Sequence, residues 1–173
     1  ENVLKYLQSG GVDTTYRTYK NLYLYGALFD GSAAMVYENM PKSDPYTIRH
    51  FLNSLFGAGL MIFTGLLARQ LSRSWLVAFL AMLLTVLSPR IFGDSMNNPK
   101  DIPFALAYVM SILGIIRFNS FLPKWNWKAA IFLGLSMSIA LNIRVGGLLL
   151  MAYFGLYTLT NLYIKRKEFK DSG

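Results

Sequence analysis

Residues 51–68 read FLNSLFGAGLMIFTGLLA and carry no charged side chain over 18 positions. A helix needs about 20 mainly apolar residues to cross the hydrocarbon core of a bilayer. Basic residues flank the stretch on both sides, with Arg49 before it and Arg69 after it. The stretch is therefore predicted to be a membrane-spanning helix.

Four further apolar stretches follow and are predicted as spans over residues 75–89, 102–116, 129–143 and 145–164. The last two come from a 36-residue stretch, residues 129–164, whose only charge is Arg144. A single helix of that length would measure about 54 Å, well beyond a hydrocarbon core of about 30 Å. We therefore predict a turn at residues 142–147 and an all-α membrane protein with about five spans.

The remainder of the chain divides around this bundle of residues 46–164. Residues 1–45 are predicted to be a non-cytoplasmic loop that contains a tyrosine-rich interfacial helix at about residues 21–40. Residues 165–173 form a basic tail. The first residue is Glu1 rather than methionine and no signal pattern precedes it, so we expect the chain to be part of a longer protein.

The composition supports a membrane protein, since 54% of the 173 residues are hydrophobic. The chain has no cysteine, so it offers neither a disulfide framework nor a thiolate metal site. The net charge of +8 raises the question of nucleic acid. However, residues 69–74, 117–128 and 165–173, which alternating spans place on one side, hold nine of the 17 basic residues but only two of the nine acidic ones. The positive-inside rule assigns that side to the cytoplasm, so membrane topology explains the basicity without nucleic acid.

Polar residues gather on the opposite side, close to the predicted span ends. Residues 89–101, PRIFGDSMNNPKD, place two carboxylates, two amides and two cations in one predicted loop. Cations of this kind can bind phosphate, and a carboxylate can act as a general base toward a hydroxyl. The candidate site residues are Asp30, Arg49, His50, Arg90, Asp94, Asn97, Asn98, Lys100, Asp101 and Arg144.

Several of these candidates also have a purely structural interpretation. Asp101 is placed to act as an N-cap with Pro103 in the first helical turn, and Asn97 and Asn98 suit a turn before Pro99. Taken by itself, Arg144 is better explained by a side chain that snorkels to lipid headgroups. His50 favours an interfacial role, because a single histidine offers no metal site. Asp30, in contrast, lies among aromatic residues without an obvious partner, which makes it a better functional candidate than Glu38.

Four segments resemble a known family. They are YGALFD at residues 25–30, RH at 49–50, NNPKDIPFA at 97–105 and NIRVGG at 142–147. Together they resemble bacterial membrane glycosyltransferases of the dolichyl-phosphate-mannose protein mannosyltransferase type. The resemblance spans nearly the whole chain, and residues 97–105 are its most specific part.

The resemblance implies a larger C-type glycosyltransferase fold in the bacterial inner membrane. Such an enzyme moves a sugar from a polyprenyl-phosphate carrier to a hydroxyl acceptor at the non-cytoplasmic face, with inversion. The sequence itself gives no reliable metal site and leaves a divalent metal cofactor open. Asp101 is expected to act in acid–base chemistry or acceptor positioning, and Lys100 and Arg144 to bind phosphate. Asp30, a second candidate catalytic residue, and Asn97 and Asn98 are expected to contact the sugar or acceptor.

Family members usually carry an acidic motif in the loop after their first span. That loop would begin here at Glu1, so the principal catalytic acid is expected upstream and this stretch alone is expected to be inactive. Two other functions fit the same polarity pattern: a transporter or flippase for a lipid-linked substrate, and a non-catalytic membrane subunit. No inverted repeat is visible, and the polar groups lie on one side rather than at mid-depth, which favours the transferase.

Overall fold

The structure is a computed structural model that describes residues 28–39, 44–122 and 126–171. The described chain is helical throughout. Its elements are α2 (Leu28–Asn39), α3 (Pro45–Ser72), α4 (Trp75–Leu87), α5 (Pro89–Asn97), α6 (Asp101–Phe121), α7 (Trp127–Ile143), the short 3-10 turn η3 (Val145–Gly147) and α8 (Leu148–Asp171). The all-α prediction is confirmed for these residues, whereas the predicted loop up to residue 27 lies outside them.

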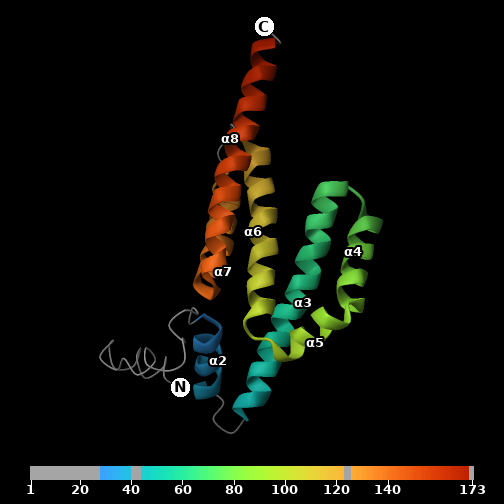
Figure 1. The fold of residues 1–173 in the computed structure, drawn as a ribbon, viewed down its shortest axis with the longest axis vertical. Helices are drawn as coiled ribbons and strands as arrows, with labels where there is room; N and C mark the ends of the chain where they lie inside the picture. The colour runs from blue at the N-terminus through green and yellow to red at the C-terminus, as the bar shows by residue number, and fades with distance from the viewer. Residues whose placement is uncertain (1–27, 40–43, 123–125, 172–173) are drawn as a thin grey trace, which may run out of the picture.

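The long helices run alternately up and down (Figure 1). Helix α6 packs between α3 and α7 and also contacts α8, with Ala107, Ala140 and Leu150 fully buried at the centre. Small residues allow the backbones to approach closely, as is common between membrane helices. A Cβ atom on Gly114 of α6, for example, would lie 3.2 Å from Leu133 Cα of α7.

Three helical stretches are long and apolar enough to cross a membrane: Pro45–Ser72, Asp101–Phe121 and Val145–Arg166. A fourth span is possible only if α4 and α5 count as one element, bent by 67°. Helix α7 is apolar but has 17 residues, which gives a length of about 26 Å. The described chain therefore supports three to four spans, and the predicted number of about five is not confirmed.

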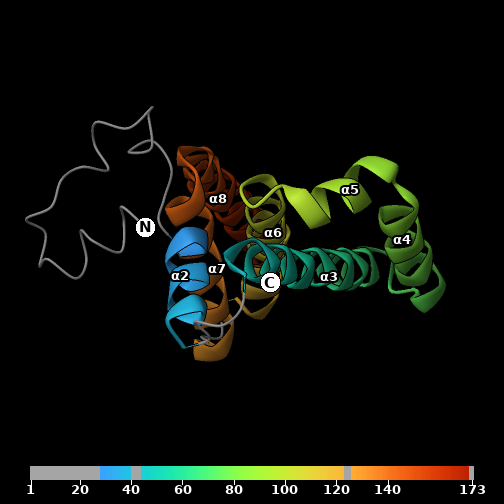
Figure 2. The same ribbon diagram turned by 90° about the horizontal axis from the view of Figure 1, so that it is seen from below.

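The predicted loop that begins at Arg90 is wrong, because Pro89–Asn97 forms helix α5. Ser88 has an extended backbone, as is typical before a proline, and this ends α4 at Leu87. Pro89 then occupies the first turn of α5, where its missing N–H is tolerated. The predicted span over residues 75–89 therefore stops two residues early, and the chain turns to run across the end of the bundle (Figures 1 and 2).

Helices α2 and α5 and the break between α7 and α8 lie at one end of the bundle, which we call the polar end (Figure 1). The turn between α3 and α4, the end of α6 and the end of α8 lie toward the other end, which we call the basic end. The predicted grouping of the basic segments is thus reproduced by the direction of the helices. Residues 28–39 of the predicted interfacial helix are helical and contact α3 and α7.

Candidate functional site

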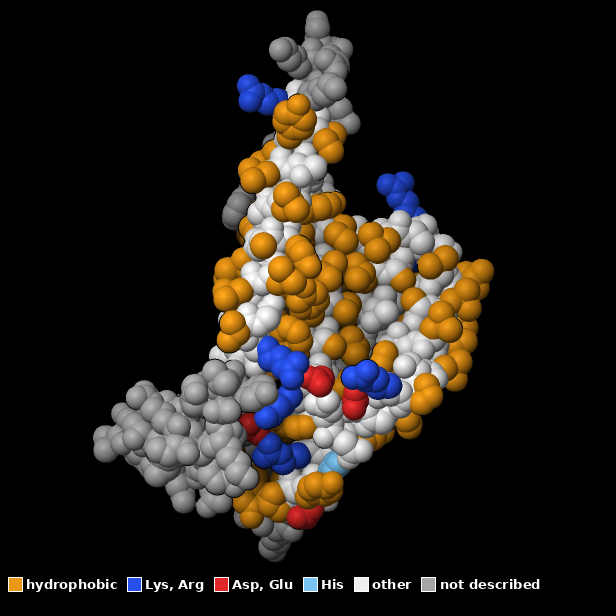
Figure 3. Space-filling model, viewed as in Figure 1, with side chains coloured by type: hydrophobic (Ala, Val, Ile, Leu, Met, Phe, Trp, Pro, Cys, Tyr) orange, Lys and Arg blue, Asp and Glu red, His pale blue; other side chains and the backbone are white. Residues whose placement is uncertain are grey.

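Charged side chains of both signs gather at the polar end, while many hydrophobic side chains lie along the helices between the two ends in the same view (Figure 3). All ten candidate site residues come from elements at this end. Alternating helices bring α2, the start of α3, α5, the start of α6 and the α7–α8 break together there. The structure divides the candidates between two cavities and the surfaces beside them.

The first cavity, the Asp101 cavity, has a volume of about 500 Å³. It combines charged residues at its polar side with apolar and hydroxyl side chains that lie further along α3 and α4. Its lining comprises Arg90, Asp94, Asp101, Arg144, Leu60, Thr64, Thr85, Ile91, Ile102, Phe104 and Ala105. The cavity therefore joins an ionic surface to the apolar depth of the bundle.

Asp101 and Arg144 form an ion pair in this cavity, with 2.7 Å between Asp101 Oδ1 and Arg144 Nη2. The other carboxylate oxygen, Asp101 Oδ2, accepts a hydrogen bond of 2.8 Å from Asn98 Nδ2. Asp101 Oδ1 is buried and accepts no well-angled hydrogen bond from the described residues. One carboxylate oxygen is thus fixed, and the other combines a cationic neighbour with spare accepting capacity.

The predicted N-cap role of Asp101 is wrong. Helix α6 begins at Asp101, and the side chain of Asn98 provides the turn, with Asn98 Oδ1 3.0 Å from Asp101 N and 3.3 Å from Lys100 N. The amide side chain satisfies N–H groups that an aspartate cap would otherwise bind. The Asp101 carboxylate is therefore available to face Arg144, and Pro103 lies in the first turn as predicted.

Arg144 lies at the break between α7 and η3, where its extended backbone ends α7. The tight turn that follows depends on Gly147, since a Cβ atom there would lie 2.8 Å from Leu141 N. The Arg144 guanidinium lies 6.0 Å from the Phe104 ring centroid, within range of a cation–π contact, and pairs with Asp101. The predicted turn is confirmed, and Arg144 is directed into the cavity rather than only toward lipid headgroups.

Helix α5 is held in place by the start of α3. Asn53, only 1% exposed, donates hydrogen bonds of 2.8 and 3.0 Å to the carbonyl oxygens of Asp94 and Ser95. His50 Nδ1 lies 2.6 Å from the carbonyl oxygen of Met96. These contacts place Arg90 and Asp94, which form an ion pair of 3.8 Å, at the cavity.

Asn53 is not among the site residues predicted from the sequence. It lies in residues 51–68, which are predicted as a span because they carry no charge, and an uncharged amide does not interrupt that pattern. The signal that would identify it is an amide side chain within an otherwise apolar helix, since such a group needs a buried hydrogen-bond partner. His50 lines neither of these two cavities and contacts α5. Asn97 is exposed at the end of α5 and, like Asn98 and Lys100, lies beside the cavities rather than in their lining.

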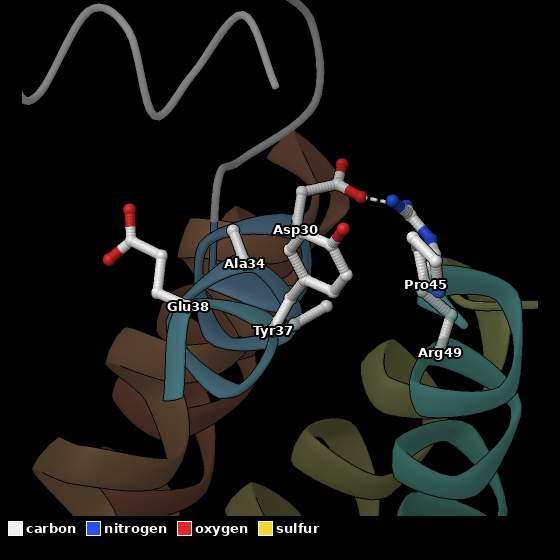
Figure 4. Close-up of a pocket in the computed structure, with 7 residues that line it drawn as sticks. Asp30, Ala34, Tyr37, Glu38, Pro45 and Arg49 are labelled. Carbon is white, nitrogen blue, oxygen red and sulfur yellow. Dashed lines mark hydrogen bonds and ion pairs between the residues drawn. The ribbon is translucent and has the colours of Figure 1, made fainter. Parts of the chain in front are cut away.

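The second cavity, the Asp30 cavity, lies between α2 and α3 and has a volume of about 560 Å³. Asp30 Oδ1 and Arg49 Nη2 form an ion pair that joins the two helices (Figure 4). Glu38 and Tyr37 also line the cavity. The expectation that Asp30 lacks an obvious partner is therefore wrong: its partner is Arg49, which the following helix brings beside it.

A metal site is not built from the described residues: they contain no group of three or more His, Asp or Glu side chains that could hold a metal ion. The charged groups instead pair a carboxylate with a guanidinium in both cavities. This arrangement provides proton acceptors beside cations that can bind a phosphate group.

The helical bundle and its polar end define a multi-pass membrane protein with an ionic centre at one surface. A family model for dolichyl-phosphate-mannose-protein mannosyltransferases matches residues 20–173, and the chain belongs to this family. The domain is therefore that of a membrane glycosyltransferase, whose family uses a lipid-phosphate-linked sugar to modify proteins. Searches of curated proteins and of solved structures give no match.

Proposed function

We propose that this domain transfers a sugar, mannose by the family's name, from a polyprenyl-phosphate carrier to a protein hydroxyl in the Asp101 cavity. The observation that carries this proposal is the Asp101–Arg144 ion pair at the polar side of a cavity that continues between apolar helices. A polyprenyl carrier requires this combination, because its chain lies in lipid while its phosphate and sugar stay at headgroup level.

Asp101 is proposed to accept the proton of the acceptor hydroxyl or to position that hydroxyl. The hydroxyl oxygen attacks the anomeric carbon, the bond from that carbon to the phosphate oxygen breaks, and its electron pair leaves with the polyprenyl phosphate. Attack opposite the leaving group inverts the anomeric configuration. Asp101 Oδ1 supports this role because it is a buried acceptor whose ion pair with Arg144 leaves accepting capacity for a hydroxyl.

Arg144 is proposed to bind the departing phosphate, with Arg90 as a second cation and Lys100 beside the cavity. Guanidinium groups bind phosphate oxygens in bidentate fashion and stabilise the charge that grows as the leaving group departs. Binding of the donor phosphate would draw Arg144 away from Asp101 and free the carboxylate for the acceptor. Asp30, Asn97 and Asn98 are proposed to contact the sugar or the acceptor around this centre.

The reaction is proposed to take place at the non-cytoplasmic face of a bacterial inner membrane. The excess of basic residues at the basic end supports this orientation. The resemblance to bacterial family members supports the choice of membrane. The family match also favours a transferase over a transporter or a non-catalytic subunit.

Transfer of labelled mannose from polyprenyl-phosphate mannose to a hydroxyl-bearing peptide tests the proposal, using full-length protein in proteoliposomes. Asp101→Asn should lower kcat by about 100-fold or more, because a general base typically contributes that much. Asp171→Asn is the matched control, since it removes a carboxylate at the far end of α8. Wild-type transfer by Asp101→Asn would refute the assigned role, while an inactive wild-type protein with this donor would refute the proposed substrate.

A further inference from the structure

Three arginines line a separate cavity at the basic end, far from the Asp101 cavity. This arginine cavity has a volume of about 410 Å³, within the range of small-molecule sites. Its lining residues come from the end of α3, the turn into α4, the start of α4 and α6, and the α3–α4 turn and the end of α6 lie toward the basic end (Figure 1). Its lining comprises Leu66, Arg69, Gln70, Arg73, Trp75 and Arg117.

Within the part of the chain that the structure describes, no carboxylate is paired with the arginines of this cavity. The ion pairs between described residues involve Arg49, Arg90 and Arg144, all at the polar end, and none of the three cavity arginines. Three guanidinium groups around one cavity repel one another, and the repulsion is relieved when an anion with several oxygens binds between them. The cavity therefore has the composition of an anion site.

Arg73 reaches the cavity from the turn that ends α3. It has φ 57°, the only positive φ at a non-glycine residue in the described chain, and it ends α3 in the left-handed conformation. Its backbone N–H donates to the carbonyl oxygen of Arg69, and glycine takes such a helix-ending position at lower cost. Having arginine there places a third guanidinium in the cavity at some expense of stability.

The surroundings identify the kind of anion. The Trp75 ring lies 3.9 Å from the Arg69 guanidinium, and tryptophan at a span end is typical of the membrane interface. Beside the cavity, Leu71 and Leu76 are 67% and 66% exposed, which provides an apolar surface for acyl chains. Basic pockets between membrane helices are known sites for anionic lipid headgroups.

We propose that the arginine cavity binds the phosphate of an anionic membrane lipid in the leaflet at the basic end. The guanidinium groups contact the phosphate, and the acyl chains lie along the exposed apolar faces of α3 and α4. The bound lipid holds the ends of α3 and α6 together. This site is separate from the proposed sugar-transfer centre and does not depend on it.

Quenching of Trp75 fluorescence by lipids with brominated acyl chains tests this proposal. The full chain with Trp125→Phe and Trp127→Phe keeps Trp75 as its single tryptophan among the three. At equal mole fractions in vesicles, brominated phosphatidylglycerol should show an apparent affinity about fivefold or more above that of brominated phosphatidylcholine. Equal quenching by the two lipids would overturn the proposal.

Two sets of variants decide whether the cavity is responsible. Arg73→Gly combined with Arg117→Gln should lower the affinity ratio of phosphatidylglycerol to phosphatidylcholine to about twofold or less. Glycine suits the φ of 57° at position 73, so the fold should be kept. Lys128→Gln combined with Arg166→Gln removes the same charge at the basic end outside the cavity and should keep the preference. A similar loss in both sets would indicate general surface charge and overturn the proposal.

Inorganic phosphate separates the two sources of the same chemistry. Excess phosphate is added to one sample, and chloride at the same ionic strength is added to a control sample. If phosphate leaves the preference for the anionic lipid unchanged, the site requires a membrane lipid as proposed. If phosphate abolishes the preference while chloride does not, the cavity binds the free ion and the lipid assignment is wrong.

Discussion

Asp101 and Arg144 come from the start of α6 and the break after α7, and their side chains meet with 2.7 Å between oxygen and nitrogen. The two residues lie far apart in the sequence, and their spacing does not predict that they pair. Asn98 takes over the turn before α6, and Gly147 allows the tight turn after Arg144. The pair is therefore a product of two local structures that end at the same cavity.

Arg144→Lys should weaken use of the lipid-linked donor more than it weakens use of the peptide. Lysine keeps the charge but lacks the planar guanidinium that binds phosphate at two points. We expect KM for the donor to rise about tenfold, a typical loss for one charge-assisted hydrogen bond. Transfer assays with varied donor concentration measure this, with Arg166→Lys as the control, and an unchanged donor KM would contradict the role of Arg144.

Gly57→Ala should displace α5 and with it Arg90 and Asp94. A Cβ atom on Gly57 would lie 2.6 Å from Ser95 Cβ, too close for either helix to keep its place. We expect a loss of about 1–3 kcal/mol in stability, as for overpacked cores, together with reduced transfer. Thermal unfolding in detergent measures the loss.

Gly134→Ala is the matched control for Gly57→Ala, because a Cβ atom on Gly134 meets nothing within 4 Å. It should leave stability unchanged or slightly raised, since alanine favours a helix over glycine. Adding Ser95→Gly to Gly57→Ala should restore part of the lost stability by removing the clash. Equal stability of the Gly57 and Gly134 variants would show that α5 does not pack as described.

The Asp30–Arg49 ion pair should contribute little to stability, despite its place between α2 and α3. The two side chains are 39% and 44% exposed, and solvent screens pairs of this kind. A double-mutant cycle with Asp30→Asn and Arg49→Gln should give a coupling below about 1 kcal/mol. A larger coupling in thermal unfolding would mean that α2 is fixed to α3 by this pair rather than by packing.

Single cysteines should distinguish the two ends, because the natural chain has none. Asn97→Cys is exposed at the polar end and should react with an impermeant maleimide added outside intact cells. Ser120→Cys is exposed at the basic end and should react only after permeabilisation. The reverse pattern would contradict the proposed orientation, and labelling of Asn97→Cys from both sides in turn would favour a transporter.

The sequence predicts the helical class and the polar end well, because long uncharged stretches and the distribution of basic residues carry that information. It predicts the break at Arg144 for the same reason: one helix would be too long for the bilayer. It fails at α5, where a polar composition indicates a loop although Pro89 starts a helix that docks on α3. Amphipathic helices at a membrane surface lack the apolar signal that identifies spans.

The pairing of site residues lies beyond what the sequence predicts. Asp30 and Arg49 meet because α2 packs against α3. Asn53 has its hydrogen-bond partners on α5, a helix whose polar composition predicts a loop. Such contacts depend on the angle between helices, which packing decides. The residue types therefore predict which end of the molecule carries the candidate site. They do not predict which of these side chains contact one another.

A double-mutant cycle on transfer activity tests the central claim that Asp101 and Arg144 act as one unit. The measurement is kcat/KM for labelled mannose transfer by Asp101→Asn, Arg144→Gln and the double variant, each compared with the wild-type protein. Residues that act together lose activity non-additively, so the double variant should fall little below the worse single variant. If the two losses multiply, or if either single variant keeps wild-type activity, the pair is not the centre of the reaction.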